Sequence, residues 1–277
     1  MEINKTKPRT GGNEKDFLWI QIRELPYFRA LLRAVEAKFY QDLTVEAPVL
    51  DIGCGDGHFA SRTFDFQIDV GIDPWEGPLR EAAKTDAYRL TIHCEGADIP
   101  YPDQSFQTVI SNSVLEHIPD VDAVMAEAGR VIKPGGSFIF CVPNHQFLGN
   151  LSVSNFFDRI GLRFAANGYR AFFNRISRHH HCDDPETWRA RLEQNGFEIV
   201  HWWHYFSPAA FHTLEWGHYF GLPAWICHFL TGKWILFPYR WNLWPVERLC
   251  RRYYEEPAEQ EAGSYTFYIA RKKEGRP

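Results

Sequence analysis

The sequence lacks the features that mark a secreted, a membrane-spanning or a disulfide-rich protein. Its six cysteines form no CxxC pair and are widely and irregularly spaced, which is typical of reduced thiols rather than of a disulfide framework. No apolar run reaches the roughly 18 residues of a spanning helix, and the nearest approach, Tyr219–Pro238, is interrupted by His228 and Lys233. The first sixteen residues are mostly polar and contain no apolar run, so no secretory signal is indicated. A cytoplasmic protein is expected.

A broadly basic surface is also missing. Lys and Arg number 30 against 35 Asp and Glu, which gives a net charge of −5 and a pI near 6.2. Proteins that bind nucleic acid normally present a basic face, so no nucleic-acid partner is expected. Aromatic side chains, in contrast, are abundant at 16% of the 277 residues. The length suits one large α/β domain with insertions.

Short apolar runs alternate with helical patterns from Pro48 onward, as in consecutive βαβ units. Strands are predicted over residues 48–52, 68–72, 88–93, 106–111, 137–142, 197–203 and 264–271. Helices are predicted over 57–64, 77–87, 121–132 and 185–195, after an N-terminal helix over 17–43 that is broken at Pro26. This pattern predicts a doubly wound, seven-stranded, mostly parallel sheet of the Rossmann-like kind, with helices on both faces.

Two segments interrupt the alternation and indicate how the chain is organised. Residues 147–182 and 205–255 show no strand pattern and are predicted to be largely helical insertions that form a cap for the substrate. The core is then made of residues 44–146, 183–204 and 264–273. All of these belong to a single domain over 17–277, which follows a polar tail at 1–16 that is predicted to be disordered.

A glycine-rich turn follows the first predicted strand, in the sequence VLDIGCGDGHFA at Val49–Ala60. Glycines in such a turn let a ligand approach the backbone closely. Asp73 ends the second strand, where a carboxylate can accept hydrogen bonds from both hydroxyls of a ribose. Asp98 follows the third strand, where it can contact an adenine amine. The ends of these strands border one crevice in a doubly wound sheet, so a cofactor with a ribose and an adenine is expected there.

These motifs resemble those of the class I S-adenosylmethionine-dependent methyltransferases, in particular the small-molecule, type 11-like group. VLDIGCGDGHFA is similar to their motif I, and VGIDPW is similar to the acidic motif at the end of their second strand. Gly96–Asn144, which begins GADIPYPDQSF and ends FCVPN, is similar to their region from the fourth strand to the fifth. The resemblance covers about residues 48–144 and, more weakly, 185–203 and 264–271.

The resemblance implies S-adenosylmethionine as the cofactor and in-line methyl transfer from its sulfonium to a small-molecule or lipid-linked acceptor. The residues implied for the cofactor are Asp51, Gly53, Cys54 and Gly55 in the turn at the methionine end, Asp73 at the ribose, Pro74 and Trp75 beside the adenine, Asp98 and Ile99 at the adenine edge, and Ser111 and Asn112 on the methionine side.

Two other classes of function stay open on the residues alone. An NAD(P)-dependent oxidoreductase can also contain a glycine-rich turn. Here, however, the third glycine follows the second by two residues instead of three, and no catalytic Tyr/Lys set is evident. A non-catalytic methyltransferase-like protein could bind the cofactor, or a partner, through its aromatic surface. A nucleic-acid methyltransferase is disfavoured, because SNSV follows the fourth strand where such enzymes carry a Pro-Pro-aromatic motif.

Two histidines are candidates for a general base. His117, in SVLEHIPD, follows the fourth strand, and His145 follows the fifth; an imidazole titrates near neutral pH and can accept a proton there. Glu116 could orient His117, although His117 could equally cap or pack against the next helix. The run His179–Cys182 suggests a metal site, but zinc ligands are normally spaced rather than consecutive, and three arginines precede the run. No metal is expected.

The two insertions hold the information on the acceptor. Phe147–Cys182 combines five arginines with one acid, Asp158, and residues 201–250 hold seven of the 10 tryptophans. Such segments suit an anionic substrate group, an anionic membrane surface, a hydrophobic lid or a dimer surface. We expect a lid over an apolar or lipid-linked acceptor, with peripheral membrane contact through 147–182 and 205–252. The acceptor's identity, the methylated atom and the oligomeric state stay open.

Overall fold

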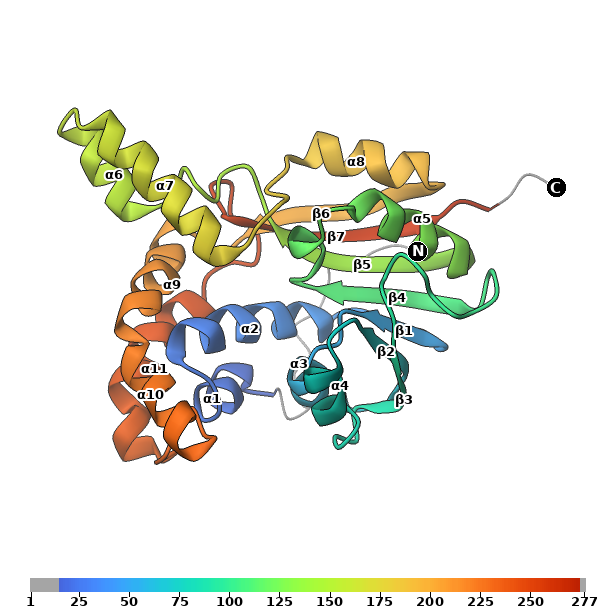
Figure 1. Ribbon diagram of the computed structural model, residues 1–277, viewed down its shortest axis with the longest axis horizontal. Helices are drawn as coiled ribbons and strands as arrows, with labels where there is room; N and C mark the ends of the chain where they lie inside the picture. The colour runs from blue at the N-terminus through green and yellow to red at the C-terminus, as the bar shows by residue number, and fades with distance from the viewer. Residues whose placement is uncertain (1–14, 275–277) are drawn as a thin grey trace.

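A seven-stranded sheet forms the centre of the computed structural model, which describes residues 15–274 (Figure 1). The strands lie in the order β3-β2-β1-β4-β5-β7-β6, and β7 is antiparallel to both of its neighbours. The chain order reverses between β1 and β4, which is the place where doubly wound sheets bind ligands. The strands are β1 (Val49–Ile52), β2 (Ile68–Asp73), β3 (Tyr88–His93), β4 (Phe106–Asn112), β5 (Ile132–Pro143), β6 (Phe197–Tyr205) and β7 (Tyr265–Lys272).

Helices cover both faces of this sheet, so its central strands are buried on both sides (Figure 1). Each face has its own apolar core, because successive strand residues point to opposite faces: Val49 belongs to one core and Leu50 to the other. The first face carries α1 (Phe17–Ile22), α2 (Tyr27–Tyr40), α3 (His58–Thr63) and α4 (Glu76–Ala82); the second carries α5 (Val121–Val131) and α8 (Pro185–Gln194). The predicted fold class is confirmed.

The helix predicted over 17–43 is broken where the sequence predicted. Pro26 precedes α2 and lies outside both helices, since a proline cannot continue the hydrogen-bond ladder of the preceding turn. The disordered tail predicted for 1–16 lies mostly outside the described residues, but its end is ordered. Asp16 caps α1 by accepting the Trp19 amide at 3.1 Å, and it pairs with Arg251 at 2.7 Å.

The start of β5 differs from the prediction. The sequence predicts a helix over 121–132 and a strand over 137–142, which leaves Lys133–Gly136 as a connection, yet β5 already begins at Ile132. Ile132 pairs with Phe106, and the register shifts before Thr108 pairs with Ser137. Gly135 has a φ of +77°. The glycines therefore form a bulged strand entry rather than a loop.

The two insertions are helical and lie at the same end of the molecule in Figure 1. The first forms a projecting pair, α6 (Ser152–Arg159) and α7 (Arg163–Ser177), and the second forms α9 (Pro208–Phe220), α10 (Leu222–Thr231) and α11 (Arg240–Tyr254). A short 3-10 helix, η1 (Leu115–His117), follows β4. None of the helices within residues 15–274 is long and apolar enough to cross a bilayer.

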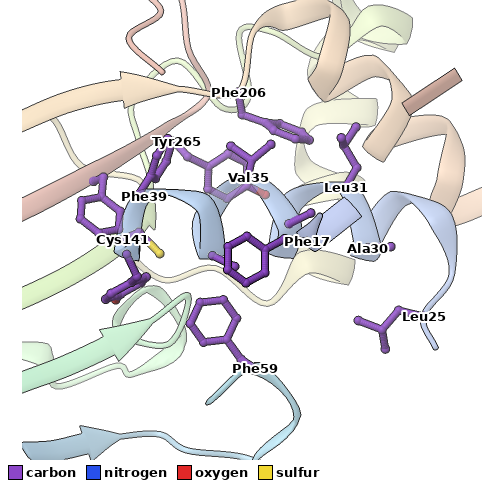
Figure 2. Close-up of a cluster of buried hydrophobic side chains, with 14 of the residues drawn as sticks. Phe17, Leu25, Ala30, Leu31, Val35, Phe39, Phe59, Cys141, Phe206 and Tyr265 are labelled. Atoms are coloured by element: carbon purple, nitrogen blue, oxygen red, sulfur yellow. The ribbon is translucent and has the colours of Figure 1, made fainter. Parts of the chain in front are cut away.

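The second insertion packs mainly against the N-terminal helices. Figure 2 shows the apolar cluster around α2, where Val35 and Phe39 lie near Phe206 and Tyr265. Phe211 of α9 belongs to the same buried cluster. The insertion that is predicted to form a lid therefore also packs against α2 and helps to hold that helix in position. α10 contributes no fully buried side chain to either core among those described.

Candidate active site

The turn after β1 is closed on one side and open on the other. Gly53 has a φ of +77°, and a Cβ there would lie 2.4 Å from Cγ1 of Val114, so any other residue would force Val114 to move. Gly55 has a φ of +56°, but a Cβ there would meet no atom within 4 Å. The backbone of the turn thus packs against the loop after β4 at Gly53, and it offers open space beside Gly55 for a ligand.

Asp73 stands at the end of β2, directly beside this turn. Its Oδ2 accepts the Gly55 amide at 2.9 Å and its Oδ1 accepts the Trp75 amide at 2.8 Å. The carboxylate is buried and held from both sides, while each oxygen keeps a second lone pair for a ligand hydroxyl. The side chain of Trp75 is 71% exposed, so its indole can offer an apolar surface next to the carboxylate.

Asp51 lies under the turn rather than at its open side. Its Oδ2 accepts the Tyr88 hydroxyl at 2.6 Å, and the carboxyl is buried. Burial raises the pKa of Asp51 to about 6, against the opposing effects of the Tyr88 hydrogen bond and the positive charge of Arg33. Arg33 on α2 is therefore close enough to act on the residue predicted to line the methionine end.

Three of the predicted cofactor residues turn their side chains into the interior. The Cys54 thiol belongs to the buried core, and burial raises its pKa above the usual range. Ser111 Oγ donates to the Ile52 carbonyl at 3.0 Å, and Asn112 Nδ2 donates to Oε2 of Glu36 at 2.6 Å. These side chains are committed to bonds between elements, which leaves their backbone atoms for any contact with a ligand.

The two residues predicted to contact the adenine edge, Asp98 and Ile99, differ in exposure within the loop after β3. Asp98 is exposed, but the amide of buried Ile99 donates to Oε2 of Glu127 at 2.9 Å. Glu95 was not predicted as a site residue, yet it is exposed only two positions after His93, which pairs in register with Asp73. Its position in CEGADIP, directly after the strand, is the signal that could have identified it. Glu95 is thus nearer the strand end than Asp98.

A cavity of about 510 Å³ adjoins the turn. Ser113 lines it, and the next residue, Val114, is the one that packs on Gly53. Arg33, whose charge acts on Asp51, also lines it. Its walls come from α2, the segment after β4, the segment after β5, the end of α7 with the residues that follow it, α9, and the start of β7. The lining residues are Phe28, Arg29, Leu32, Arg33, Ser113, Glu116, His117, Phe147, Ile176, Ser177, Arg178, His179, Leu214, His218 and Tyr265.

Of the two predicted bases, only His117 reaches the cavity. Its Nδ1 lies 3.1 Å from the Arg178 carbonyl, which only accepts, so Nδ1 carries the proton and Nε2 keeps a free lone pair. Burial lowers the pKa of His117, which keeps the ring neutral and able to accept a proton at pH 7. His145 is exposed beside His204, with 5.8 Å between ring centres, and is not among the residues lining the cavity.

Glu116, His117 and His179 bring ligand-type atoms within 4.8 Å of one another. Of the run His179–Cys182, only His179 enters the cavity, because the His180 and His181 amides turn back to the Glu116 carbonyl. Oε1 of Glu116 lies 3.8 Å from Nε2 of His117. Two ligand atoms that each bind one tetrahedral zinc ion at about 2.0 Å lie closer to each other than that. Arginines also line this cavity and oppose a cation, so the absence of a metal stays a prediction.

Replacing Glu116 with glutamine is expected to stabilise the protein at alkaline pH. Burial raises the pKa of Glu116 to about 8, so the folded state disfavours the ionised form. The stability that protonation provides is present below the ordinary pKa of 4.5 and is lost as the pH rises toward 8. Thermal unfolding should show a gain for Glu116→Gln that is larger at pH 9 than at pH 5 by roughly 4 kcal/mol, since one pKa unit between the folded and unfolded states is worth about 1.4 kcal/mol. Equal stability of the two proteins at pH 9 would contradict the expected burial of this carboxyl.

Arg29, Arg33 and Glu36 are site residues that sequence reasoning missed. All three lie in the segment that was treated only as an apolar helix. Their spacing of four and three residues places them on one side of a helix, and that spacing was the available signal. Glu36 is buried and accepts the hydroxyls of Ser113 and Tyr205, each at 2.9 Å, in addition to the amide of Asn112.

Comparison with known sequences connects this geometry with a family. A family model described as a methyltransferase domain matches residues 20–202. A ubiquinone biosynthesis O-methyltransferase of Vibrio atlanticus is 32% identical over 108 residues, which is 36% of this chain and 44% of that protein. A 27-O-demethylrifamycin SV methyltransferase of Amycolatopsis mediterranei is 36% identical over 97 residues, which is 32% of this chain and 35% of that protein. Each match spans less than half of the relative's own length.

Solved structures of the same fold are more distant in sequence. An S-adenosylmethionine-dependent methyltransferase of Thermotoga maritima superposes with a TM-score of 0.54 at 16% identity, over 90% of this chain and 91% of that chain. A [4+2]-cyclase superposes with a TM-score of 0.53 at 18% identity, over 89% and 82% of the two chains. At these identities the likeness shows the fold alone, and the cyclase illustrates that one fold serves several reactions.

Proposed function

The chain belongs to the methyltransferase-domain family, and on that premise we propose that it transfers a methyl group from S-adenosylmethionine to a small-molecule acceptor. The observation that carries the proposal is that the glycine turn and the cavity border the same loop, the one that follows β4. Ser113 lines the cavity and Val114 packs on Gly53, so a donor held at the turn and an acceptor held in the cavity meet at this loop. Such alignment is the main contribution a protein makes to a displacement reaction.

The residues around the turn fit the cofactor. Open space beside Gly55 accommodates its methionine part, and the remaining lone pairs of Asp73 can accept the two ribose hydroxyls. Trp75 offers a surface for the adenine, and Glu95 or Asp98 can accept its amine. When bound, this cofactor supplies a methyl group already activated on a sulfonium. The chain itself binds, orients and excludes water.

His117 is proposed as the group that accepts a proton from the acceptor. Its Nε2 lone pair is free and its ring lines the cavity. A hydroxyl acceptor would lose its proton to Nε2 as the oxygen takes the methyl group, and an amine would lose its proton in the same way. We make no such assignment for His145, which is not among the cavity-lining residues.

Turnover is the direct test of this function. Purified protein incubated with S-adenosylmethionine and a panel of small acceptors should release S-adenosylhomocysteine, measured by mass spectrometry. One acceptor should gain about 14 Da, because a methyl group replaces a hydrogen atom. His117→Ala should reduce turnover more than it reduces acceptor binding. Tight binding of S-adenosylhomocysteine without turnover of any acceptor would favour the non-catalytic alternative, and reduction of NAD(P) would favour the oxidoreductase.

Contact with a membrane surface is proposed for the two insertions. Large apolar side chains are exposed on α7 and α10, with Phe164 at 93%, Phe229 at 76% and Leu230 at 72%. Arg163 and Lys233 accompany them, and basic residues near exposed aromatic ones suit an anionic lipid surface. Because both insertions lie at one end of the molecule (Figure 1), one flat surface can touch both.

Liposome flotation should therefore show binding that depends on anionic lipid. We expect the full chain to float with vesicles containing phosphatidylserine and less with pure phosphatidylcholine, because the basic residues add attraction only to the former. Phe164→Ser with Phe229→Ser should reduce flotation several-fold by removing apolar anchors. Phe66→Ser, which alters an aromatic side chain that is 45% exposed elsewhere on the chain, should not. Absence of flotation with either lipid would rule out membrane contact.

A further inference from the structure

Three arginines line the acceptor cavity, and they are the feature that says most about the acceptor. Arg29 and Arg33 lie one helical turn apart on α2, and Arg178 follows the end of α7. Like charges four residues apart destabilise a helix. Partial removal from water and the charge of Arg33 both lower the pKa of Arg29. The positive charges gathered at this cavity therefore destabilise the protein when no anion is bound.

No carboxylate within the described residues forms an ion pair with any of these three arginines. Some arginines elsewhere are paired, as Arg62 is with Glu24 at 2.7 Å and Arg251 is with Asp16 at 2.7 Å. Arg29 and Arg33 instead lie over aromatic rings, at 5.8 Å from Trp234 and 5.4 Å from Phe59. Asp56 attracts Arg29, and Asp51 and Glu116 attract Arg33, in each case without a direct ion pair.

The other titratable groups in the cavity do not offset this charge at neutral pH. Glu116 is the one acid among the lining residues, and burial raises its pKa to about 8, so it is mostly protonated. Burial lowers the pKa of His179 to about 3, and it lowers those of His117 and His218 as well, so the three rings are neutral. The cavity therefore presents three fixed positive charges to whatever enters it.

The backbone at Arg178 is held in an unusual conformation. Arg178 ends α7 with a φ of +56°, in the left-handed region that favours glycine. Its amide donates to the Arg175 carbonyl, and its own carbonyl accepts His117 Nδ1. An arginine in this conformation destabilises the fold relative to glycine, so its presence is not explained by stability. Residues with such unfavourable backbone conformations concentrate at functional sites.

We infer that this cavity recognises a phosphoryl group of the acceptor, a phosphate or diphosphate, through Arg29, Arg33 and Arg178. The inference rests on the proposed function, in which the cavity is the acceptor site. Guanidinium groups bind phosphate oxygens in a bidentate manner. A phosphate monoester carries roughly −2 at pH 7, which matches three cations better than a single carboxylate does. Phe28, Leu32 and Leu214 line the same cavity and can pack against an apolar remainder.

Binding of inorganic pyrophosphate to the full chain, measured by isothermal titration calorimetry, tests the inference. We expect saturable binding that is retained in the presence of saturating S-adenosylhomocysteine. Arg29→Gln and Arg33→Gln should each weaken it roughly ten- to hundred-fold, as expected for loss of charged hydrogen bonds. The control is Arg175→Gln, an exposed arginine of α7 that is not among the cavity-lining residues, and it should bind as wild type does.

Arg178→Gly separates recognition from folding. Glycine removes the strain of the positive φ, so the melting temperature should equal or exceed that of wild type while pyrophosphate affinity falls at least tenfold. The inference is overturned if wild type does not bind pyrophosphate, if Arg175→Gln weakens binding as much as Arg178→Gly, or if S-adenosylhomocysteine displaces pyrophosphate. The last result would assign the arginines to the cofactor's carboxylate.

A second pair of probes distinguishes the source of the phosphoryl group. Tighter binding of decyl phosphate than of inorganic phosphate would support a lipid-linked acceptor, because only the former uses the apolar walls. Equal binding would support a polar phosphorylated metabolite. These readouts need no turnover, so the proposed methyl transfer can fail while this site stands. Loss of S-adenosylhomocysteine binding, measured separately, would refute the proposed function but not this inference.

Discussion

Asp73→Ala is expected to weaken binding of S-adenosylhomocysteine by at least about 100-fold. The carboxylate at the end of β2 is fixed by the amides of Gly55 and Trp75, at 2.9 and 2.8 Å, and it keeps two lone pairs for the ribose hydroxyls. Hydrogen bonds to a charged group are worth about 1.5–3 kcal/mol each, and about 1.4 kcal/mol corresponds to a tenfold change in affinity. Loss of two such bonds therefore predicts a change of two to four orders of magnitude, measured by calorimetry.

Two further variants keep this prediction interpretable. Alanine also leaves two backbone amides without their acceptor, so thermal unfolding must be measured in parallel. Asp73→Asn retains one acceptor oxygen and should fold more stably than the alanine variant while still losing at least tenfold in affinity, because the charge is gone. Glu81→Gln, at an exposed carboxylate of α4 paired with Lys84, should bind as wild type does. Wild-type affinity in folded Asp73→Ala would show that the ribose is not bound at this carboxylate.

The sheet and the turn could be read from the sequence because both depend on local patterns. A buried parallel strand is a short apolar run, and the residue after it falls at one edge of the sheet. Asp73 was placed correctly at the end of β2 for this reason. β3 also has the predicted bounds, although it lies at the edge of the sheet and is largely exposed. The glycine-containing segment Lys133–Gly136 is compatible with either a loop or an irregular strand. Pairing of β5 with β4 makes it part of the strand.

The direction of individual side chains could not be read in this way. Alternation along β4 says that Ser111 and Asn112 face opposite sides of the sheet, but helices cover both sides, so both are interior. The partner of Asn112 is Glu36, which precedes it by 76 residues. Long-range partnerships of this kind depend on how α2 packs on the sheet, and nothing in the neighbourhood of either residue encodes that packing.

The acceptor cavity was the least predictable part, because its walls come from six separate segments of the chain. The arginines in the first insertion did indicate an anion, but of those only Arg178 lines the cavity. The other two arginines come from α2, far upstream in the sequence. In the histidine run, neighbouring residues point in different directions, so only His179 joins Glu116 and His117. Convergence in space, rather than composition of one segment, defines this site.

Gly55→Ala and Gly53→Ala form a matched pair that should separate binding from folding. Both glycines have positive φ, of +56° and +77°, so alanine costs roughly 1–2 kcal/mol at either position. At Gly55 the new methyl group meets no atom of the protein within 4 Å. The variant should fold with a slightly lower melting temperature, yet its methyl group occupies the space proposed for the cofactor. We expect its affinity for S-adenosylhomocysteine to fall at least tenfold, since overpacking typically costs about 1–3 kcal/mol.

At Gly53 the balance is reversed. The new methyl group would lie 2.4 and 2.7 Å from the two γ carbons of Val114, so the loop after β4 must move and the cost of overpacking adds to that of the backbone. Gly53→Ala should therefore lose roughly 2–5 kcal/mol of stability, measured by urea unfolding. Gly53→Ala combined with Val114→Ala should recover part of this loss, because the colliding methyl groups are gone. If Gly55→Ala instead binds the cofactor normally, the open side of the turn is not where the cofactor lies, and the donor site must be sought elsewhere along the strand ends.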